Sequence, residues 1–442
     1  MSEVFLKDFE SFAGPSTAEG PEWLEPIRRE AMEQFARKGF PTSRDEEWRF
    51  TPVTRIAQGT WQQAWTRLSG EEDGFGRVSP DDLDPFVFGQ ADWSTLVFVD
   101  GEFSPELSKV GILPAGVQVT SLSGALRNGG DLLERHLTRY AAIEESPFTA
   151  LNTAFLRDGG VIHVPAGVEM PVPIHLVYVT TPEADGTVSH PRNLIVLERN
   201  ARASVVESYV SLAGGAQYWT NPVTEIRTGP NSWLEHTRIQ RESEAAFHVA
   251  TTQVEVHRDS HYRSFSMAMG AALARHNLNV RLADQSSEAL LYGLYLTRNE
   301  QLVDTHTTIY HDHPNCHSWE VYKGILDGRS RAVFNGKVMV QPEAQKTNAK
   351  QTNRNLILSD FAKVDTKPQL EIFADDVKCT HGATVGRLPE LPLFYARSRG
   401  LPAADAERLL TYAFAAEVIE EVVLVPVRDE LEALVRERIA LR

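Results

Sequence analysis

From about residue 155 onward the sequence reads as a long series of short strands, and turn-forming residues interrupt it at nearly even intervals. Successive turn residues stand 13 to 17 positions apart in the clearest part of this series: Asp284, Asn299, Pro314, Asp327, Pro342, Ser359 and Asp375. One strand and one corner of this length fit half a coil of a β-solenoid, and two half-coils give a repeat of about 30 residues. The spacing therefore predicts a mainly β fold with a parallel β-helix (β-solenoid) core over residues 155–388.

The main alternative for this region is a sandwich of antiparallel hairpins. Such hairpins need tight two-residue turns, and Asn-Gly is the strongest sequence signal for one. Between residues 155 and 388 only Asn335–Gly336, within "FNGK", offers that signal. The solenoid is therefore favoured, and the connections between its parallel strands are expected to be right-handed.

Helical patterns lie on both sides of the predicted solenoid. Residues 1–154 are expected to form a mainly helical domain, because Leu24, Ile27, Ala31 and Phe35 share one helix face. Residues 389–442 are expected to form a C-terminal helical domain of two amphipathic helices. An apolar stripe at four-residue spacing marks the first of them: Ala406, Leu410, Phe414 and Val418. Such helices can cap a solenoid or present the stripe to a partner.

Charge and hydropathy exclude several classes of protein. The chain has 44 Lys and Arg against 60 Asp and Glu, which gives a formal net charge of −16. A surface of this sign repels nucleic acid. No apolar run is long enough to span a bilayer, and the first residues lack the pattern of a signal peptide. We therefore expect no nucleic-acid or membrane partner and a cytoplasmic location.

The chain contains only two cysteines, Cys316 and Cys379. Two cysteines cannot provide the four thiolates that usually hold an iron–sulfur cluster, so any cluster would need ligands from another chain or from other residue types. No phosphate-binding loop, G-x-S-x-G elbow or H-E-x-x-H motif is present. The sequence thus shows no local signature of an enzyme.

Each cysteine stands near histidines. The segment "YHDHPNCHSW" contains a cluster of four candidate metal ligands: His311, His313, Cys316 and His317. Pro314 predicts a corner inside this cluster, so solvated or hydrogen-bonded histidines are favoured there, and a metal site is the alternative. In "DDVKCTHGATVG", Cys379 and His381 alternate along a predicted strand and share one face. If that face points into the coil, both side chains are buried core residues. If it meets another subunit, a protonated His381 would favour the thiolate form of Cys379.

Three long stretches resemble the SufB/SufD family of iron–sulfur cluster assembly proteins, and most closely its SufD members. They are "KVDTKPQLEIFADDVKCTHGATVGRL", "LFYARSRGL" and "CHSWEVYKGILDGRSRAVFNGKV". The "CTHGAT" form is similar to SufD, whereas SufB chains typically read "HEAT" there. The resemblance implies a right-handed parallel β-helix between an N-terminal and a C-terminal helical domain.

The resemblance also implies a function and partners. It implies a non-catalytic scaffold subunit in a complex with SufB and two copies of the ATPase SufC, which would dock on the C-terminal helices and their apolar stripe. A nascent iron–sulfur cluster would be held transiently between a SufB cysteine and the histidine of "CTHG", which is His381 here, with Cys379 beside it. The sequence leaves open whether the chain also forms a homodimer, whether a flavin takes part, and which sulfur donor is used.

Two other functions stay open at this stage. A β-helix enzyme acting on polysaccharide would normally be secreted and would stack acidic and basic residues at a spacing of one coil, and neither feature is evident. A stand-alone histidine-rich metalloprotein would use the cluster around His311 and His313.

Overall fold

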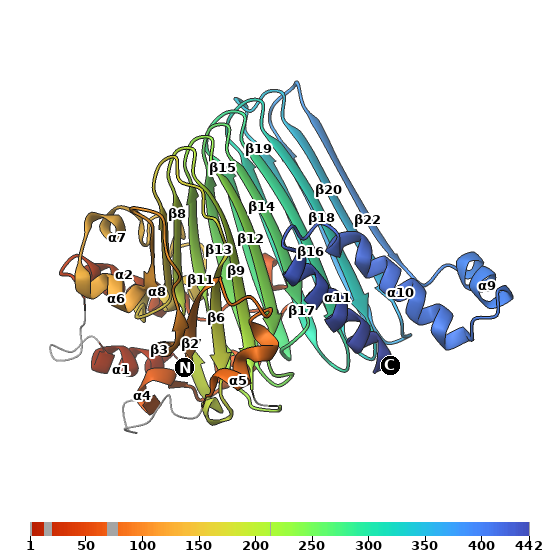
Figure 1. The fold of residues 1–442 in the computed structure, drawn as a ribbon, viewed down its shortest axis with the longest axis horizontal. Coiled ribbons are helices and arrows are strands. Elements are labelled where there is room, and N and C mark those ends of the chain that lie inside the picture. The colour runs from red at the N-terminus through yellow and green to blue at the C-terminus, as the bar shows by residue number, and fades with distance from the viewer. Residues whose placement is uncertain (1, 13–19, 69–77, 213, 442) are drawn as a thin grey trace.

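The chain folds into a parallel β-solenoid with helices at both ends of the sequence (Figure 1). The computed structural model describes residues 2–12, 20–68, 78–212 and 214–441. Within these residues, eight coils each contribute one strand to each of two sheets. The predicted β-helix is therefore confirmed.

The two sheets, called A and B here, contain alternate strands of the chain. The eight coils contribute these strands to sheet A: β5 (Gly160–Val164), β8 (Arg192–Leu197), β11 (Val223–Thr228), β13 (Phe247–Val256), β15 (Leu273–Leu282), β17 (Leu302–His311), β19 (Arg331–Val340) and β21 (Lys363–Ile372). They contribute these strands to sheet B: β6 (Ile174–Thr180), β9 (Arg202–Ser211), β12 (Trp233–Arg241), β14 (His261–Ala268), β16 (Glu288–Thr297), β18 (His317–Leu326), β20 (Asn348–Ile357) and β22 (Lys378–Gly386).

The first coils are extended by strands from the N-terminal part of the chain. On sheet B, β2 (Ser94–Val99) pairs parallel with β6, and β3 (Glu102–Lys109) pairs antiparallel with β2. On sheet A, β4 (Gln118–Ser121) pairs antiparallel with β5. Short side strands are β1 (Gln62–Gln63), β7 (Thr187–Ser189) and β10 (Trp219–Thr220).

The corners between coils lie where the sequence predicts them. All seven predicted turn residues from Asp284 to Asp375 fall between strands. On one side of the solenoid the corners share a left-handed residue, with φ between 55° and 62°: Asn200, Asn231, Asp259, Ser286, Asn315 and Lys346. Asn and Asp, which occupy four of these six positions, adopt this conformation at low cost. The N–H of Asn315 donates to the Gln345 carbonyl of the next corner at 3.0 Å, so the corners stack in register.

The Asn-Gly hairpin signal does not form a turn. Asn335 and Gly336 lie in the middle of β19, which pairs in parallel with β17 and β21. Tertiary pairing overrides the local preference here, because a hairpin would break both ladders.

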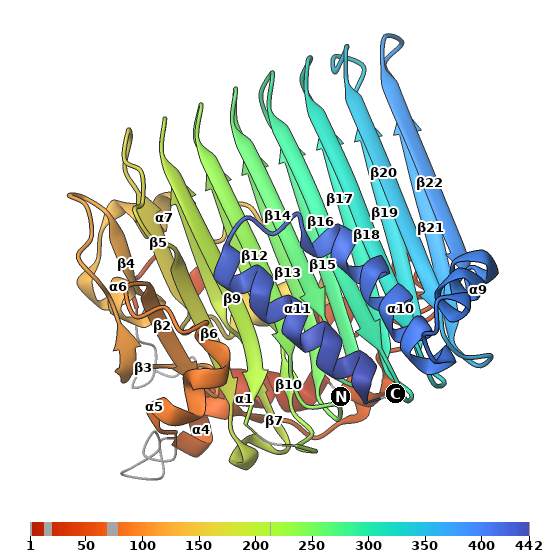
Figure 2. The same cartoon turned by 45° about the vertical axis from the view of Figure 1, so that its right-hand side comes forward.

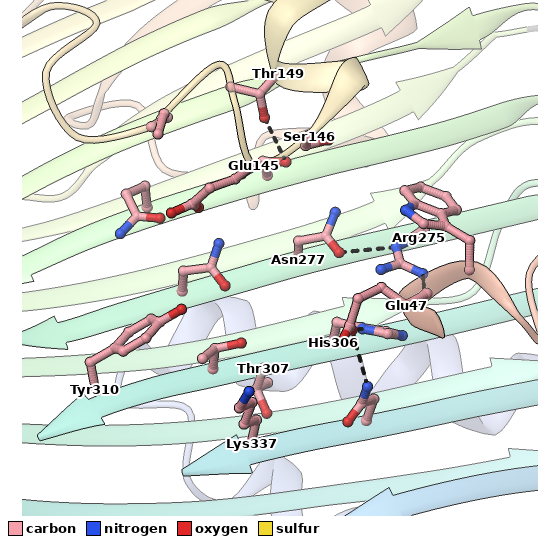
Figure 3. Close-up of a pocket in the computed structure, with 18 residues that line it drawn as sticks. Glu47, Glu145, Ser146, Thr149, Arg275, Asn277, His306, Thr307, Tyr310 and Lys337 are labelled. Atoms are coloured by element: carbon pink, nitrogen blue, oxygen red, sulfur yellow. Dashed lines mark hydrogen bonds and ion pairs between the residues drawn. The ribbon is translucent and has the colours of Figure 1, made fainter. Parts of the chain in front are cut away.

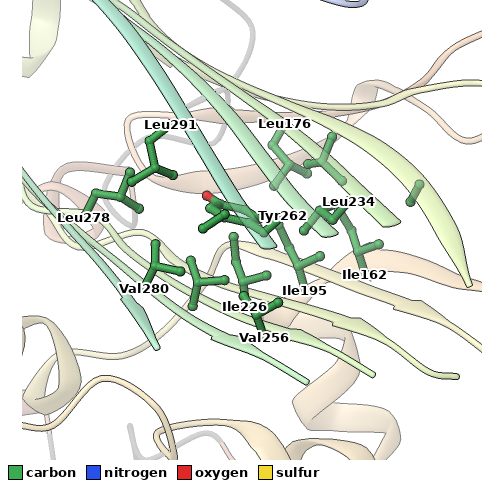
Figure 4. Packing of buried hydrophobic residues seen from close by; sticks show 14 of the residues in the cluster. Ile162, Leu176, Ile195, Ile226, Leu234, Val256, Tyr262, Leu278, Val280 and Leu291 are labelled. Atoms are coloured by element: carbon green, nitrogen blue, oxygen red, sulfur yellow. The ribbon is translucent and has the colours of Figure 1, made fainter. Parts of the chain in front are cut away.

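The interior of the solenoid is filled by columns of apolar side chains (Figure 4). One column on sheet A stacks seven β-branched residues in register, each at most 1% exposed: Ile162, Ile195, Ile226, Val254, Val280, Ile309 and Val338. Burying each such side chain contributes about 1.5–3 kcal/mol to stability.

The N-terminal helices pack on the start of the solenoid. They are α1 (Ser2–Phe12), α2 (Leu24–Lys38), α3 (Thr54–Gln58), α4 (Ala64–Leu68), α5 (Pro80–Leu83), α6 (Leu122–Asn128), α7 (Asp131–His136) and α8 (Pro147–Ala154). Three-residue 3₁₀ turns occupy Glu46–Trp48, Asp84–Phe86 and Pro182–Ala184. The predicted face of α2 is used, since Leu24, Ala31 and Phe35 are buried, and Gly39 ends the helix with φ of 64°. Aromatic side chains dominate this contact, as in the edge-to-face pair of Phe5 and Phe35.

Of the three C-terminal helices, the second and third lie along the side of the solenoid rather than over its end, whereas the first projects away from the strands in Figure 1 (Figures 1 and 2). These helices are α9 (Glu390–Ser398), α10 (Ala403–Ile419) and α11 (Val425–Ala440). Both α10 and α11 bury an apolar face against sheet B. Val418 is 1% exposed there, and the ring of Phe414 lies 4.5 Å from Lys323 Nζ. Part of the apolar stripe that was predicted to dock a partner therefore packs against sheet B of the same chain, because the outer surface of this sheet is apolar.

Among the described helices, none combines the length and the apolar character that crossing a bilayer requires.

Candidate functional site

The last coil of the solenoid is open. β22 pairs with β20 on one side, and no strand of the described chain pairs with its other edge. β21 ends sheet A in the same way. Figure 2 shows both strands at the end of the stack that is opposite to the N-terminal helices. An unpaired strand edge exposes a row of N–H and C=O groups that another chain can pair with.

Cys379 and His381 both lie on this terminal strand β22. They stand one coil above Ala349 and Gln351, which are buried at 1% and 2% exposure. Residues paired in register point to the same side of a parallel sheet, so Cys379 and His381 occupy the interior face of the last coil. Because no further coil covers them, Cys379 is only half-buried and His381 is exposed.

The Cys379 thiol lies in an apolar environment, which is one of the two alternatives that the sequence left open. Its side chain packs against a small apolar cluster that includes Val338, Ala349 and Val377. Burial raises the pKa of Cys379, opposed by a hydrogen bond from the Ala349 backbone. In the isolated chain this favours the thiol over the thiolate, so a partner or a bound metal would have to promote deprotonation.

Apolar side chains surround the open end. The large hydrophobic residues exposed there are Phe361 at 62%, Ile372 at 38%, Phe373 at 60% and Val385 at 46%. Exposed apolar groups gathered beside an unpaired strand edge are typical of a protein interface. The open end thus combines a pairing edge, an apolar rim and two side chains that can bind a soft metal.

The second cluster, around His311, does not converge on one point. His311 is buried, its Nε2 lies 2.9 Å from the Ser318 hydroxyl, and burial lowers its pKa to about 3. Cys316 is also buried, with Sγ 3.2 Å from the Ser287 hydroxyl. His313 and His317 are exposed at the corner. In the described parts of the chain, no group of three or more His, Cys, Asp or Glu residues is placed to hold a metal.

A polar cavity of about 330 Å³ lies between sheet A and the N-terminal segments (Figure 3). Arg275 lies on its floor, 2.7 Å from the Asp304 carboxylate and 3.8 Å from the centre of the Trp48 ring. His306 contacts Glu47 at 3.2 Å. Burial would raise the pKa of Asp304, but Arg275 and His306 outweigh it and lower the pKa to about 2.

These charges pair with one another. The ion pairs beside the cavity hold residues 46–48 against the solenoid. Sequence reasoning missed the cavity because its residues come from separate coils. Only their common outward face on sheet A brings Arg275 and His306 together.

Comparisons with known proteins match almost the whole chain. Residues 178–414 match the SufBD core domain of the SUF system for FeS cluster assembly, and residues 2–176 match the SufBD protein N-terminal region. The chain belongs to the SufBD family. It is therefore an iron–sulfur cluster assembly protein of this family, as its sequence motifs predict.

Similar curated proteins place the chain nearer to SufD. It is 36% identical over 417 residues to an iron–sulfur cluster assembly SufBD family protein of Synechocystis, covering 92% of this chain and 89% of that protein. It is 33% identical to the iron–sulfur cluster assembly protein SufD of Escherichia coli, with 89% and 88% covered. The SufD of Bacillus subtilis is 27% identical, with 99% and 98% covered. The chain is thus a SufD-like member of the SufBD family.

Proposed function

We propose that this chain is a non-catalytic scaffold subunit of a SufBCD-type complex, and that a nascent iron–sulfur cluster is its transient cargo. The observation that carries the proposal is the placement of His381 and Cys379 on the open terminal strand β22. A cluster held there needs ligands from a second chain, since the described residues offer no group of three. The partner at the open end is SufB, which would pair with the free edges of β21 and β22.

His381 is the principal ligand in this proposal. Its imidazole is exposed, and a neutral imidazole nitrogen is a good ligand for iron. Cys379 is an auxiliary thiol, because it shares the strand face but lies half inside the apolar cluster. The remaining ligands, including a cysteine, come from SufB.

The ATPase SufC docks on the C-terminal helices in this proposal. Residues 389–442 form that docking region, and residues 1–154 and 155–388 are the N-terminal and β-helix units. The exposed apolar residues near α9 and the start of α10 support the proposed surface: Leu391 at 78%, Phe394 at 70%, Tyr395 at 60% and Leu409 at 51%. We place the complex in the cytoplasm, where free thiols such as Cys316 and Cys379 stay reduced.

The test is the iron and sulfide content of the complex after co-expression with SufB and SufC. His381→Ala should lose most of the cluster while the melting temperature of the isolated chain stays within about 1 °C of wild type. Cys379→Ser should show a milder loss. His313→Ala is the matched control, because it removes another exposed histidine from a corner of the solenoid.

Normal cluster content in His381→Ala would reject the ligand role. Light scattering of the isolated chain addresses the open end separately. If β21 and β22 are built for SufB, the chain alone should be monomeric or a weak dimer, and adding SufB should displace any homodimer. A homodimer that SufB does not dissociate would argue for self-association as the native use of this end.

A further inference from the structure

A polar column stands directly beneath His381 in the solenoid interior. In sheet B, His381 of β22 pairs in register with Gln351 of β20, and Gln351 pairs with Glu320 of β18. Both residues beneath His381 are almost wholly buried, at 2% exposure for Gln351 and 1% for Glu320. Below them the column becomes apolar at Leu291 of β16. The polar part of the column therefore ends at the proposed ligand.

The amide of Gln351 is held from two sides. Its Nε2 donates a hydrogen bond of 2.7 Å to Oε2 of Glu320. From sheet A, Gly336 faces the same amide so closely that a Cβ at this position would lie 2.1 Å from Nε2. A side chain at position 336 would therefore force the Gln351 amide to shift away from its present place. Its orientation is set by the folded solenoid, without any contribution from His381.

One atom of this amide lacks a partner. Oε1 of Gln351 is buried and accepts no hydrogen bond from any residue that the structure describes. Buried polar atoms are nearly always hydrogen-bonded, so an unpartnered acceptor beside a candidate site calls for a donor. Neighbouring strands lie about 4.8 Å apart, and His381 is the residue next above Gln351 on the interior face. An imidazole N–H is the donor that this position can supply.

We propose that Gln351, held by Glu320, is a positioning residue for His381. In this proposal the exposed imidazole turns toward the coil interior, and Gln351 Oε1 then accepts a hydrogen bond from one of its nitrogens, which fixes the tautomer and leaves the other nitrogen free to bind iron. Histidine ligands in proteins commonly use their second nitrogen in this way, and the partner also sets the ring orientation. The ligand role rests on the proposed function above, whereas the hydrogen bond to Gln351 does not.

The hydrogen bond is tested on the isolated full-length chain, where no cluster is needed. The probe is ¹⁵N NMR of the chain labelled at histidine, with the His381 signals assigned by their loss in His381→Ala. Wild type should show one dominant tautomer at His381. Gln351→Met keeps the side-chain length but removes the acceptor, so His381 should shift to the mixture of tautomers found for a free imidazole.

Asn353→Leu is the matched control for this experiment. Asn353 lies on the same strand at 1% exposure, and its amide also makes interior hydrogen bonds, but it pairs with Ala383 rather than His381. The control should lower the melting temperature and leave the His381 signals unchanged. A purely structural role for Gln351 predicts that the two variants behave alike at His381, and that result would overturn the proposal.

A second variant covers the case in which Gln351→Met does not fold. The exchange Glu320→Gln with Gln351→Glu keeps the buried pair, with the amide donating in the opposite direction, and places a carboxyl group under His381. The dominant tautomer should be retained and its N–H signal should move, because the acceptor has changed. Signals identical to wild type would mean that residue 351 does not contact the imidazole.

Cluster content links the inference to the proposed function. In the co-expressed complex, Gln351→Met should reduce iron several-fold, though less than His381→Ala, and the exchanged pair should restore part of it. If His381→Ala retains its cluster, the ligand role is wrong, and the NMR result still decides whether Gln351 orients the ring. If His381→Ala loses its cluster but Gln351→Met changes neither tautomer nor iron, the positioning role alone is rejected.

Discussion

Arg192 and Glu225 form an ion pair of 2.7 Å in which both side chains are completely buried. Glu225 also accepts hydrogen bonds from the backbone N–H groups of Thr138 and Tyr140, at 2.7 and 2.8 Å. Arg192 donates from Nη1 to the Asn152 side chain at 3.1 Å. One pair of charges on neighbouring strands of sheet A thus anchors two N-terminal segments to the solenoid.

Removing one member of this pair should be costly. Glu225→Ala leaves the guanidinium of Arg192 buried without a counter-charge and removes the acceptor of three backbone donors, those of Thr138, Tyr140 and Ala141, so we expect a loss of about 3–5 kcal/mol in the free energy of unfolding. Urea denaturation measures it. The control is Asp360→Ala, which breaks an ion pair with Arg387 that is largely exposed on both sides, and it should change little. Equal effects of the two variants would contradict the anchoring role.

The Glu320 carboxyl should make stability depend on pH. Burial raises its pKa to about 7 from an ordinary value of 4.5. The folded chain therefore holds this proton where the unfolded chain has released it, and the stabilising effect is complete below pH 4.5 and is lost as the pH rises through 7. Relative to Glu320→Gln, wild type should lose about 2–3 kcal/mol between pH 4.5 and 8, measured by denaturation. A difference that stays constant over this range would show that Glu320 titrates normally.

Gly336 on the interior face of β19 and Gly382 on the outer face of β22 should respond differently to the same change. Gly336→Ala places a Cβ 2.1 Å from the Gln351 amide, which must shift and disturb its buried hydrogen bond to Glu320, so we expect a loss of about 1–3 kcal/mol. Gly382→Ala on β22 meets no atom within 4 Å and should be tolerated. Thermal unfolding of both variants is the measurement. A stable Gly336→Ala would mean that the amide can move, which would also weaken the case for a fixed Gln351.

Substitutions at two apolar residues of the C-terminal helices should distinguish a role in docking from a role in folding. Phe394 is 70% exposed on α9, whereas Val418 is 1% exposed on α10. Phe394→Asp should weaken SufC capture in a pull-down by about tenfold or more, with no change in melting temperature, if α9 is the docking surface. Val418→Asp should lower the melting temperature sharply, because it buries an unpaired charge against sheet B. Full SufC binding by folded Phe394→Asp would place the contact elsewhere.

Local sequence patterns were enough to predict the solenoid and its corners. Turn residues such as Asn299 and Asp327 recur at strand-length spacing, and each stands at a corner of the structure. Both signals are local, since a corner needs only residues that accept a turn and a strand needs only alternation. That Cys379 and His381 lie on the same face of one strand was predictable for the same reason. Membership of the SufBD family was also visible in short motifs, and the comparisons confirm it.

What those motifs face depends on contacts that form only in the folded chain. The spacing of Phe414 and Val418 was read correctly as an apolar stripe, but a stripe does not reveal whether it packs on its own sheet or on a partner. The Asn-Gly pair at 335–336 shows the opposite case, where pairing with both neighbouring strands overrides a strong local turn signal. Gln351 and Glu320 are separated by 31 residues, and nothing local marks them as a pair. Register between coils places them beneath His381, because contacts in a solenoid form between residues about one coil apart.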